Sequence, residues 1–187
     1  MTKVLEIDLF VYLMYRNRFM AQKHYEAAYK LYETYYNSKS RNLLLSLNID
    51  GECSAVIKEC LYAAENCIKF LFALFYKEEA YSTHGMMIKG ISHGGIRRIF
   101  NKYFVRRKGG SLLKTQVFQD NLKDGYDDIL DERSSADYGK LTGSLHNAEV
   151  ALDWCNKFCN ASCKLANDNY PGFLKDLDYY IEKYVNI

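Results

Sequence analysis

The sequence predicts an all-α fold, in the form of an antiparallel four- to five-helix bundle with additional N- and C-terminal helices. The 187 residues are 49% hydrophobic and 26% charged, a composition that supports a packed core and is atypical of disordered chains. Pro171 is the single proline, whereas an all-β fold of this size would need many more turn residues. Apolar residues also recur at helical spacing along most of the chain.

Two long helices are expected in the N-terminal half. Residues 3–36 are apolar and tyrosine-rich at helical spacing, and Asn37–Ser40 either breaks or bends this helix. The apolar pattern continues over 41–47, and a turn is expected at 48–51. Residues 53–76 contain no glycine or proline and are apolar on more than one face, which is typical of a central buried helix.

A tyrosine stripe marks the first of these helices. Its members recur every three or four residues and therefore share one helix face: Tyr25, Tyr29, Tyr32 and Tyr36. Aromatic stripes on helices usually pack against another helix, so packing is the favoured interpretation and base stacking is the alternative.

Shorter elements are expected in the C-terminal half, together with a long helix that closes the bundle. The helices should cover 96–105, 112–131, 140–167 and 173–185. A glycine- and serine-rich connection precedes the first of them at 81–95, and a turn precedes the last at 167–172. We expect all of these elements to belong to a single helical domain over residues 1–187.

The six cysteines form two triplets, each on one face of an expected helix. One triplet has a spacing of seven residues and the other a spacing of four: Cys53, Cys60 and Cys67, then Cys155, Cys159 and Cys163. We interpret them as small buried apolar residues in a reducing cytoplasm. The chain has no Cys-x-x-Cys pair, so we expect no metal site, and we expect no disulfides or cofactor either.

The sequence also predicts a cytoplasmic protein without a membrane contact. Residues 1–10 include Glu6 and Asp8 and show no small-residue cleavage site, so they do not resemble a secretory signal. The longest apolar stretch, around 68–76, is far shorter than the ~20 residues that span a bilayer.

Charge is strongly segregated although the net charge is only +2. Residues 80–119 contain no acidic side chain and eight basic ones, whereas 120–132 contains six acidic ones. Such segregation produces a strong local field. The basic run Arg106–Lys108 is either a contact for a phosphate backbone or an ordinary solvated helix end.

The segment Ser92–Arg98 is a candidate phosphate site. It is glycine-rich and opens a basic helix, and the free N–H groups at a helix N-terminus favour anions. His93 could bind phosphate or act as an acid–base group, while Arg97 and Arg98 add positive charge. The alternative is an ordinary loop whose glycines satisfy backbone geometry.

A second candidate lies in the charged stretch 131–138. The fork of Arg133 can hold two phosphate oxygens, and the Tyr138 hydroxyl can donate a hydrogen bond to them. Asp137 can orient the arginine or act as a base. The alternative is a structural salt-bridge cluster between helices.

Together these segments resemble the HEPN superfamily (higher eukaryotes and prokaryotes nucleotide-binding). The resemblance follows their order: apolar helical motifs at 42–45, 54–56 and 60–64, then His93–Val105, then Arg133-x-x-Ala136-Asp137-Tyr138, then a long helix. It covers a core of about 41–165, which leaves an N-terminal helical extension at 1–40 and a C-terminal helix at 171–187. The branch that it resembles carries an Arg-x-x-Ala-Asp-Tyr signature.

The resemblance implies an all-α, cytoplasmic protein that forms a homodimer around the motif. Many such proteins are encoded beside a small nucleotidyltransferase, as a toxin–antitoxin pair. Many are also metal-independent endoribonucleases, in which an arginine and a following polar residue precede a histidine by four to six residues. Here Arg133 and Ser134 match that pattern, which makes Arg133 and Tyr138 the implied catalytic pair. Tyr138 stands at the histidine position, and tyrosine titrates near pH 10 rather than near neutrality.

Three functions therefore remain open from the sequence. The first is a protein that binds nucleotide or RNA phosphates through Arg133, Asp137 and Tyr138, with help from the basic helix that His93 precedes. The second is an active endoribonuclease that uses Arg133 with Tyr138 or with His93. The third is a non-catalytic homodimeric interaction module.

Overall fold

The computed structural model describes residues 2–40, 49–76, 79–80, 91–105, 125–131, 133 and 144–171. Every element within these ranges is helical, so the predicted all-α class is confirmed. The elements are α1 (Thr2–Ser40), α2 (Ile49–Phe75), α5 (His93–Ile99), η2 (Phe100–Val105) and α7 (Leu145–Asn169). A further helical segment covers 125–131.

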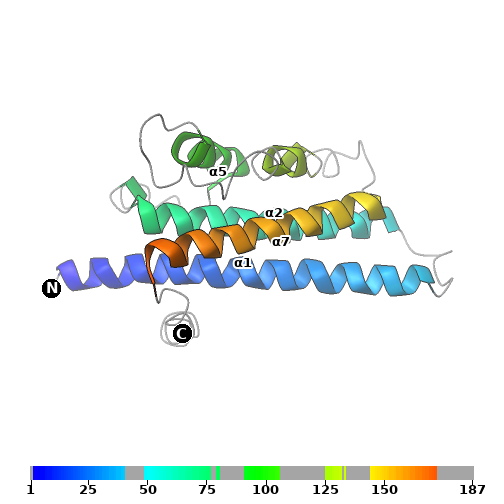
Figure 1. Cartoon of the computed structure of the whole chain (residues 1–187), viewed down its shortest axis with the longest axis horizontal. Helices are drawn as coiled ribbons and strands as arrows, with labels where there is room; N and C mark the ends of the chain where they lie inside the picture. The colour runs from blue at the N-terminus through cyan, green and yellow to red at the C-terminus, as the bar shows by residue number, and fades with distance from the viewer. Residues whose placement is uncertain are drawn as a thin grey trace.

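Three long helices form the body of the molecule (Figure 1). Helix α2 runs antiparallel to α1 and packs along it, and α7 runs in the direction of α2 and contacts both. Helix α5 and segment 125–131 lie on the opposite side of α2 from α1. Helix α2 is therefore covered from several directions.

Helix α2 is the central helix because its sequence is apolar almost all round. Val56, Leu61, Phe70 and Leu71 point in different directions from the helix axis, and each is at most 1% exposed. The prediction of a central buried helix at 53–76 is confirmed, but the expected turn at 48–51 is wrong, because α2 begins at Ile49. One glycine inside a helix costs only about 1 kcal/mol relative to alanine, which the burial of α2 outweighs.

The predicted helix at 3–36 is confirmed as α1, which continues through Ser40 without a break.

The tyrosine stripe on α1 is divided between two environments. Tyr25 and Tyr32 are partly buried against the core, as the packing interpretation requires. Tyr29 and Tyr36 are 45% and 55% exposed, so that interpretation is wrong for half of the stripe.

Helix α7 confirms the predicted closing helix over 145–167 and extends two residues beyond it. Its N-terminus is fixed by Ser144, whose hydroxyl accepts a hydrogen bond from the Asn147 N–H at 3.1 Å. Buried residues recur along its length on the face toward the core: Ala148, Ala151, Leu152, Cys155, Phe158 and Leu165. The expected turn at 167–172 is also shifted, because α7 ends at Asn169.

Helix α5 begins earlier than the sequence predicted. The helix was expected from 96, but it begins at His93 because Ser92 is its N-cap, with extended backbone angles and a side chain that accepts from the Gly95 N–H. The helix then widens into the π-helix η2 at Phe100. In that widened turn the Tyr76 hydroxyl donates to the Tyr103 carbonyl oxygen at 3.1 Å, which gives this backbone acceptor a partner.

Several predicted segments lie outside the described residues. They are the apolar stretch at 41–47, the basic run Arg106–Lys108, the helix over 112–124, the start of the closing helix at 140–143 and the C-terminal helix at 173–185.

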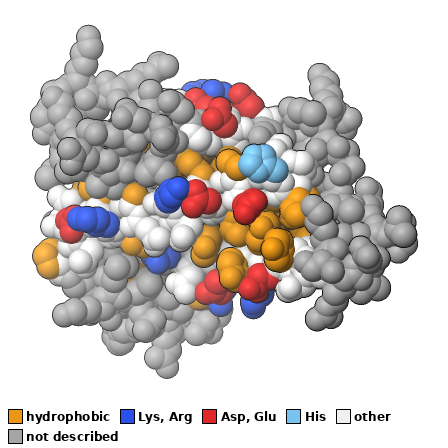
Figure 2. Space-filling view, turned by 45° about the vertical axis from the view of Figure 1, so that its right-hand side comes forward, with side chains coloured by type: hydrophobic (Ala, Val, Ile, Leu, Met, Phe, Trp, Pro, Cys, Tyr) orange, Lys and Arg blue, Asp and Glu red, His pale blue; other side chains and the backbone are white. Residues whose placement is uncertain are grey.

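The face shown in Figure 2 mixes charged and hydrophobic side chains of the described residues. Large hydrophobic residues are exposed on α1 at Tyr29 and Tyr36, on α7 at Val150, and just after α7 at Tyr170. No helix in the described ranges is both long enough and apolar enough to cross a membrane.

Replacing Gly125 with alanine should destabilise the fold. A Cβ atom there would lie 2.3 Å from Nε1 and 2.4 Å from Cδ1 of the rigid Trp154 indole on α7. We expect the free energy of unfolding to fall by about 1–3 kcal/mol in urea titrations. The matched control is Gly94→Ala, where the added Cβ meets nothing within 4 Å, and helix propensity should give a gain of up to about 1 kcal/mol. Equal stability of the two variants would refute the close Gly125–Trp154 contact.

Candidate functional site

A polar stripe runs along the otherwise apolar helix α2. Its members recur every three or four residues and therefore share one face: Lys58, Tyr62, Glu65 and Lys69, with Glu59 beside them. A polar stripe on a buried helix is costly unless partners from other elements satisfy it. Helices α1 and α5 and residue 133 supply those partners.

Tyr62 is the centre of this arrangement. The His93 ring, at the start of α5, stacks on the Tyr62 ring with 5.9 Å between centroids and 17° between planes. The guanidinium carbon of Arg133 lies 5.7 Å from the same ring centroid, in cation–π geometry. From α1, the His24 ring lies 5.3 Å away in a tilted orientation. We call Lys58, Glu59, Tyr62, Glu65, His24, His93 and Arg133 the Tyr62 cluster.

Two histidine–carboxylate pairs flank Tyr62. Nδ1 of His24 lies 2.6 Å from a Glu59 oxygen, and Nδ1 of His93 contacts Oε1 of Glu65. The second pair is asymmetric, because the Glu65 side chain is 4% exposed and the His93 side chain is 31% exposed. A buried carboxylate that holds Nδ1 fixes the ring orientation and directs Nε2 to proton exchange or ligand contact.

Glu65 links the electrostatics of the whole cluster. Its burial raises its pKa above the ordinary value, although His93, Lys69 and Arg133 all act to lower it. His93 and Arg133 therefore act on one carboxylate as well as on one aromatic ring. Burial also lowers the pKa of Lys69, one turn further along α2.

Tyr126, in segment 125–131, is a buried neighbour of Glu65. The side chain is fully buried, and its hydroxyl has no hydrogen-bond partner at ordinary distance among the described residues. Burial, reinforced by the nearby charge of Glu65, raises the pKa of Tyr126 far above its usual value. The hydroxyl therefore keeps its proton at physiological pH and can act only as a neutral donor or acceptor.

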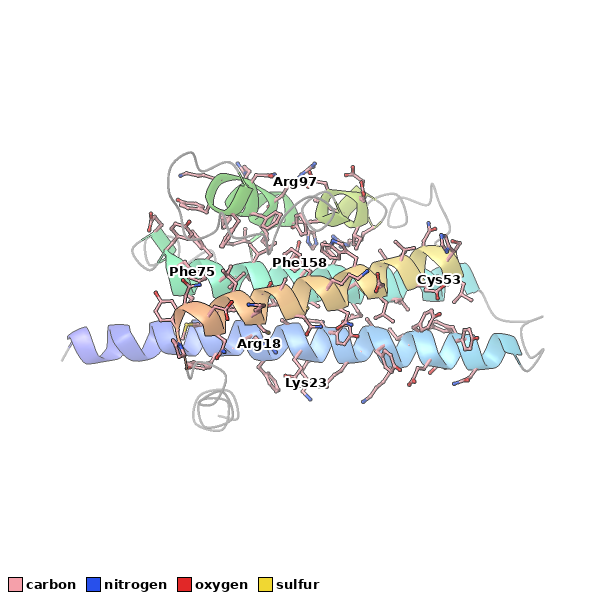
Figure 3. The ribbon with its side chains drawn as sticks, in the orientation of Figure 1. Arg18, Lys23, Cys53, Phe75, Arg97 and Phe158 are labelled. Atoms are coloured by element: carbon pink, nitrogen blue, oxygen red, sulfur yellow. The ribbon has the colours of Figure 1, made fainter. Side chains whose placement is uncertain are left out.

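The structure brings together two of the residues that the sequence singled out, His93 and Arg133. Arg97 instead pairs with Asp127 at 2.9 Å, which joins α5 to segment 125–131, and Figure 3 labels it on α5. That contact with Asp127 raises the pKa of Arg97. Arg98 is exposed, and its Nε donates to the Gly94 carbonyl oxygen at 3.3 Å. Asp137 and Tyr138 lie outside the described residues.

The glycines before the basic helix have a structural explanation. Gly95 is buried, and a Cβ there would lie 2.3 Å from Cγ2 of Ile91, so the close packing of this turn favours glycine. The Ser92 hydroxyl already accepts from the Gly95 N–H at 3.2 Å. The geometry thus favours glycines that satisfy the backbone of this turn over a loop that binds phosphate. His93 is then the residue of this segment that can take part in binding or catalysis.

Sequence reasoning missed Tyr62, Glu59, Glu65 and His24 as site residues. For α2 a signal existed, because its polar residues repeat at helical spacing inside an apolar helix. His24 follows Arg18 at a spacing that formally fits the arginine-to-histidine pattern, but the pair lies in another part of the chain than the motif around Arg133, so the match is interpreted as coincidence. Its position beside Tyr62 depends on how α1 packs against α2.

No protein-family model, curated protein or solved structure matches this chain. Within the described ranges, no group of three or more histidine, cysteine, aspartate or glutamate side chains is arranged to hold a metal ion.

Proposed function

We propose that this chain is a HEPN-like protein that binds phosphate groups of a nucleotide or of RNA at the Tyr62 cluster. One observation carries the proposal: Arg133 and His93, from separate elements, lie against the same tyrosine ring while both remain partly exposed. A guanidinium fork and an imidazole N–H are donors of the kind that hold phosphate oxygens.

The charges of the cluster are compatible with an anionic ligand, because its two carboxylates each have a histidine partner. Both carboxylates on the α2 stripe are already engaged by histidines, Glu59 by His24 and Glu65 by His93. Lys58, whose Nζ lies 5.8 Å from the Tyr62 ring centroid, adds a second cation next to the same ring. A phosphate that enters here meets cations at the partly exposed rim while the acidic groups are paired.

The resemblance to HEPN proteins extends the proposal to partners. The protein would be the toxin-like component of a pair with a small nucleotidyltransferase antitoxin, and it would act as a cytoplasmic homodimer. Two copies of Arg133, supported in each copy by Asp137 and Tyr138, would then face one ligand across the dimer.

Replacing Arg133 with alanine should weaken RNA binding by about 10- to 100-fold, because charge-assisted hydrogen bonds to phosphate contribute about 1.5–3 kcal/mol. Fluorescence anisotropy with a labelled single-stranded RNA would measure the Kd at two salt concentrations. The slope of log Kd against log salt should also fall by about 1 in the variant. The matched control is Arg98→Ala, which removes an exposed arginine whose Nε donates to the nearby Gly94 carbonyl oxygen.

Two outcomes would contradict the proposal. Equal affinities for wild type and Arg133→Ala would show that phosphate is not held by Arg133. Loss of a dimer in Arg133→Ala, combined with no binding of RNA or ATP by the wild type at low salt, would favour the interaction module instead.

A second candidate function, a metal-independent endoribonuclease, is favoured by the position of His93. The motif around Arg133 has Tyr138 where such enzymes have histidine. His93 is an imidazole that lies against the same tyrosine as Arg133 and is held by a buried carboxylate. It could supply the acid–base group that tyrosine does not supply near neutral pH.

A further inference from the structure

Three cysteine sulfurs meet where α2 packs against α7. The Sγ atom of Cys159 lies 3.6 Å from Sγ of Cys67 and 3.9 Å from Sγ of Cys155. The Cys155 sulfur also lies 3.5 Å from the Cys60 carbonyl oxygen. Members of both cysteine triplets of the sequence thus meet at this interface, and none of the six cysteines forms a disulfide.

Cys159 differs from its two neighbours in exposure and in charge. Cys67 and Cys155 are buried, whereas Cys159 is partly exposed. Hydrogen bonds from Cys155 and Cys67, together with the positive charge of Arg18, lower the pKa of Cys159, while burial raises the pKa of Cys67. Of the three thiols, Cys159 is therefore the one that is both accessible and most readily ionised.

Arg18 supplies a positive charge from α1, the long helix that packs against both α2 and α7. Figure 3 shows it on α1, alongside the C-terminal half of α7, and α1 and α7 are in contact. Its Nε is buried and has no hydrogen-bond partner among the described residues. A thiolate in this cluster would give that buried cationic group a counter-charge.

We propose that Cys159 is an oxidation site and that it closes a reversible disulfide with Cys67, which links α7 to α2. The oxidant is a hydroperoxide, such as hydrogen peroxide. Cys67 is the resolving thiol because its sulfur is nearer than that of Cys155 and because it lies on the opposite helix. The sulfurs must approach by about 1.5 Å to reach the bonded distance of about 2.05 Å.

The chemistry has two steps. The Cys159 thiolate attacks one peroxide oxygen, so that an S–O bond forms, the O–O bond breaks, and hydroxide leaves and takes a proton from water or buffer. Cys67 sulfur then attacks the sulfenic sulfur, the S–S bond forms, the S–O bond breaks, and the leaving hydroxide takes the Cys67 proton as water. Two thiols and one peroxide thus give one disulfide and two waters. A dithiol reductant reverses the reaction.

The test uses the full-length, reduced protein and hydrogen peroxide. After alkylation of the remaining thiols, intact mass and peptide mapping should show one new disulfide, Cys67–Cys159, with loss of about 2 Da for the two hydrogens. Cys155→Ser should still form it. Cys67→Ser should instead accumulate sulfenic acid at Cys159, which dimedone traps, and Cys159→Ser should form neither product.

Because a variant can fail to fold, the same peptide mapping is also decisive on the wild-type protein alone. A Cys155–Cys159 bond, a bond that involves Cys53 or Cys163, or an unchanged six-thiol protein after peroxide would each overturn it. RNA binding does not enter the assay, so its result is independent of the function proposed for the Tyr62 cluster.

Discussion

Replacing Phe158 with alanine is expected to lower the free energy of unfolding by about 3–5 kcal/mol. Phe158 is fully buried on α7, where Figure 3 labels it at the centre of the molecule. Its ring lies 4.9 Å from the Trp154 ring on the same helix and 5.8 Å, edge-on, from the Phe100 ring. Alanine would leave a cavity and remove the aromatic contact between α7 and η2.

The loss in the free energy of unfolding should be larger than the Phe158 side chain alone suggests, because Phe100 connects Phe158 to further aromatic side chains. The Phe100 ring packs 5.4 Å from the Tyr126 ring in segment 125–131 and 6.1 Å from the Phe104 ring in η2. Five aromatic residues from three elements therefore share one cluster. Loosening it should also disturb α5, which continues directly into Phe100 and carries His93 at its start.

Urea titration followed by circular dichroism would measure the change, with Val150→Ala as the matched control on the same helix. Val150 is 53% exposed, so its truncation should alter the free energy of unfolding by no more than about 0.5 kcal/mol. A loss below about 1 kcal/mol for Phe158→Ala would show that this core is not packed as described.

The sequence predicted the long helices well because their signals are local and repeated. Residues 53–76 bury apolar side chains in every direction, and no partner is needed to recognise that pattern as a central helix. Boundaries were predicted less well. The start of α5 depends on the N-cap Ser92, whose hydroxyl accepts a hydrogen bond from the Gly95 N–H, and two adjacent glycines obscured it as a helix start.

The site was predicted in part, for a related reason. Arg133 and His93 stand out from the sequence as an arginine in a charged motif and a histidine before a basic helix. That these two residues meet at Tyr62 was not predictable, because it requires the placement of α5 and residue 133 over α2. The segregation of charge was also visible in the sequence. Only the structure shows that Arg97 on α5 forms an ion pair with Asp127 in segment 125–131.

Replacing His93 with glutamine is expected to slow RNA cleavage by about 100- to 10,000-fold, the usual contribution of a positioned acid–base group. Glutamine keeps the size and a polar end but cannot exchange a proton near neutral pH. Gel assays with structured and unstructured RNA in the presence of a chelator would measure the rate. The matched control is His146→Gln, which changes an exposed histidine at the start of α7 and should leave the rate unchanged.

Glu65→Gln separates positioning from chemistry. If Glu65 orients the His93 ring through Nδ1, this variant should lose less activity than His93→Gln and should shift the pH at which the rate is half-maximal. A purely structural Glu65 would change stability but not the pH profile.

Wild-type protein that cleaves neither RNA would make the endoribonuclease candidate wrong, and His93→Gln would then report only on phosphate affinity. Cleavage that survives His93→Gln but not Arg133→Ala would assign the acid–base role to a residue other than His93, for which Tyr138 is the candidate that the sequence supplies.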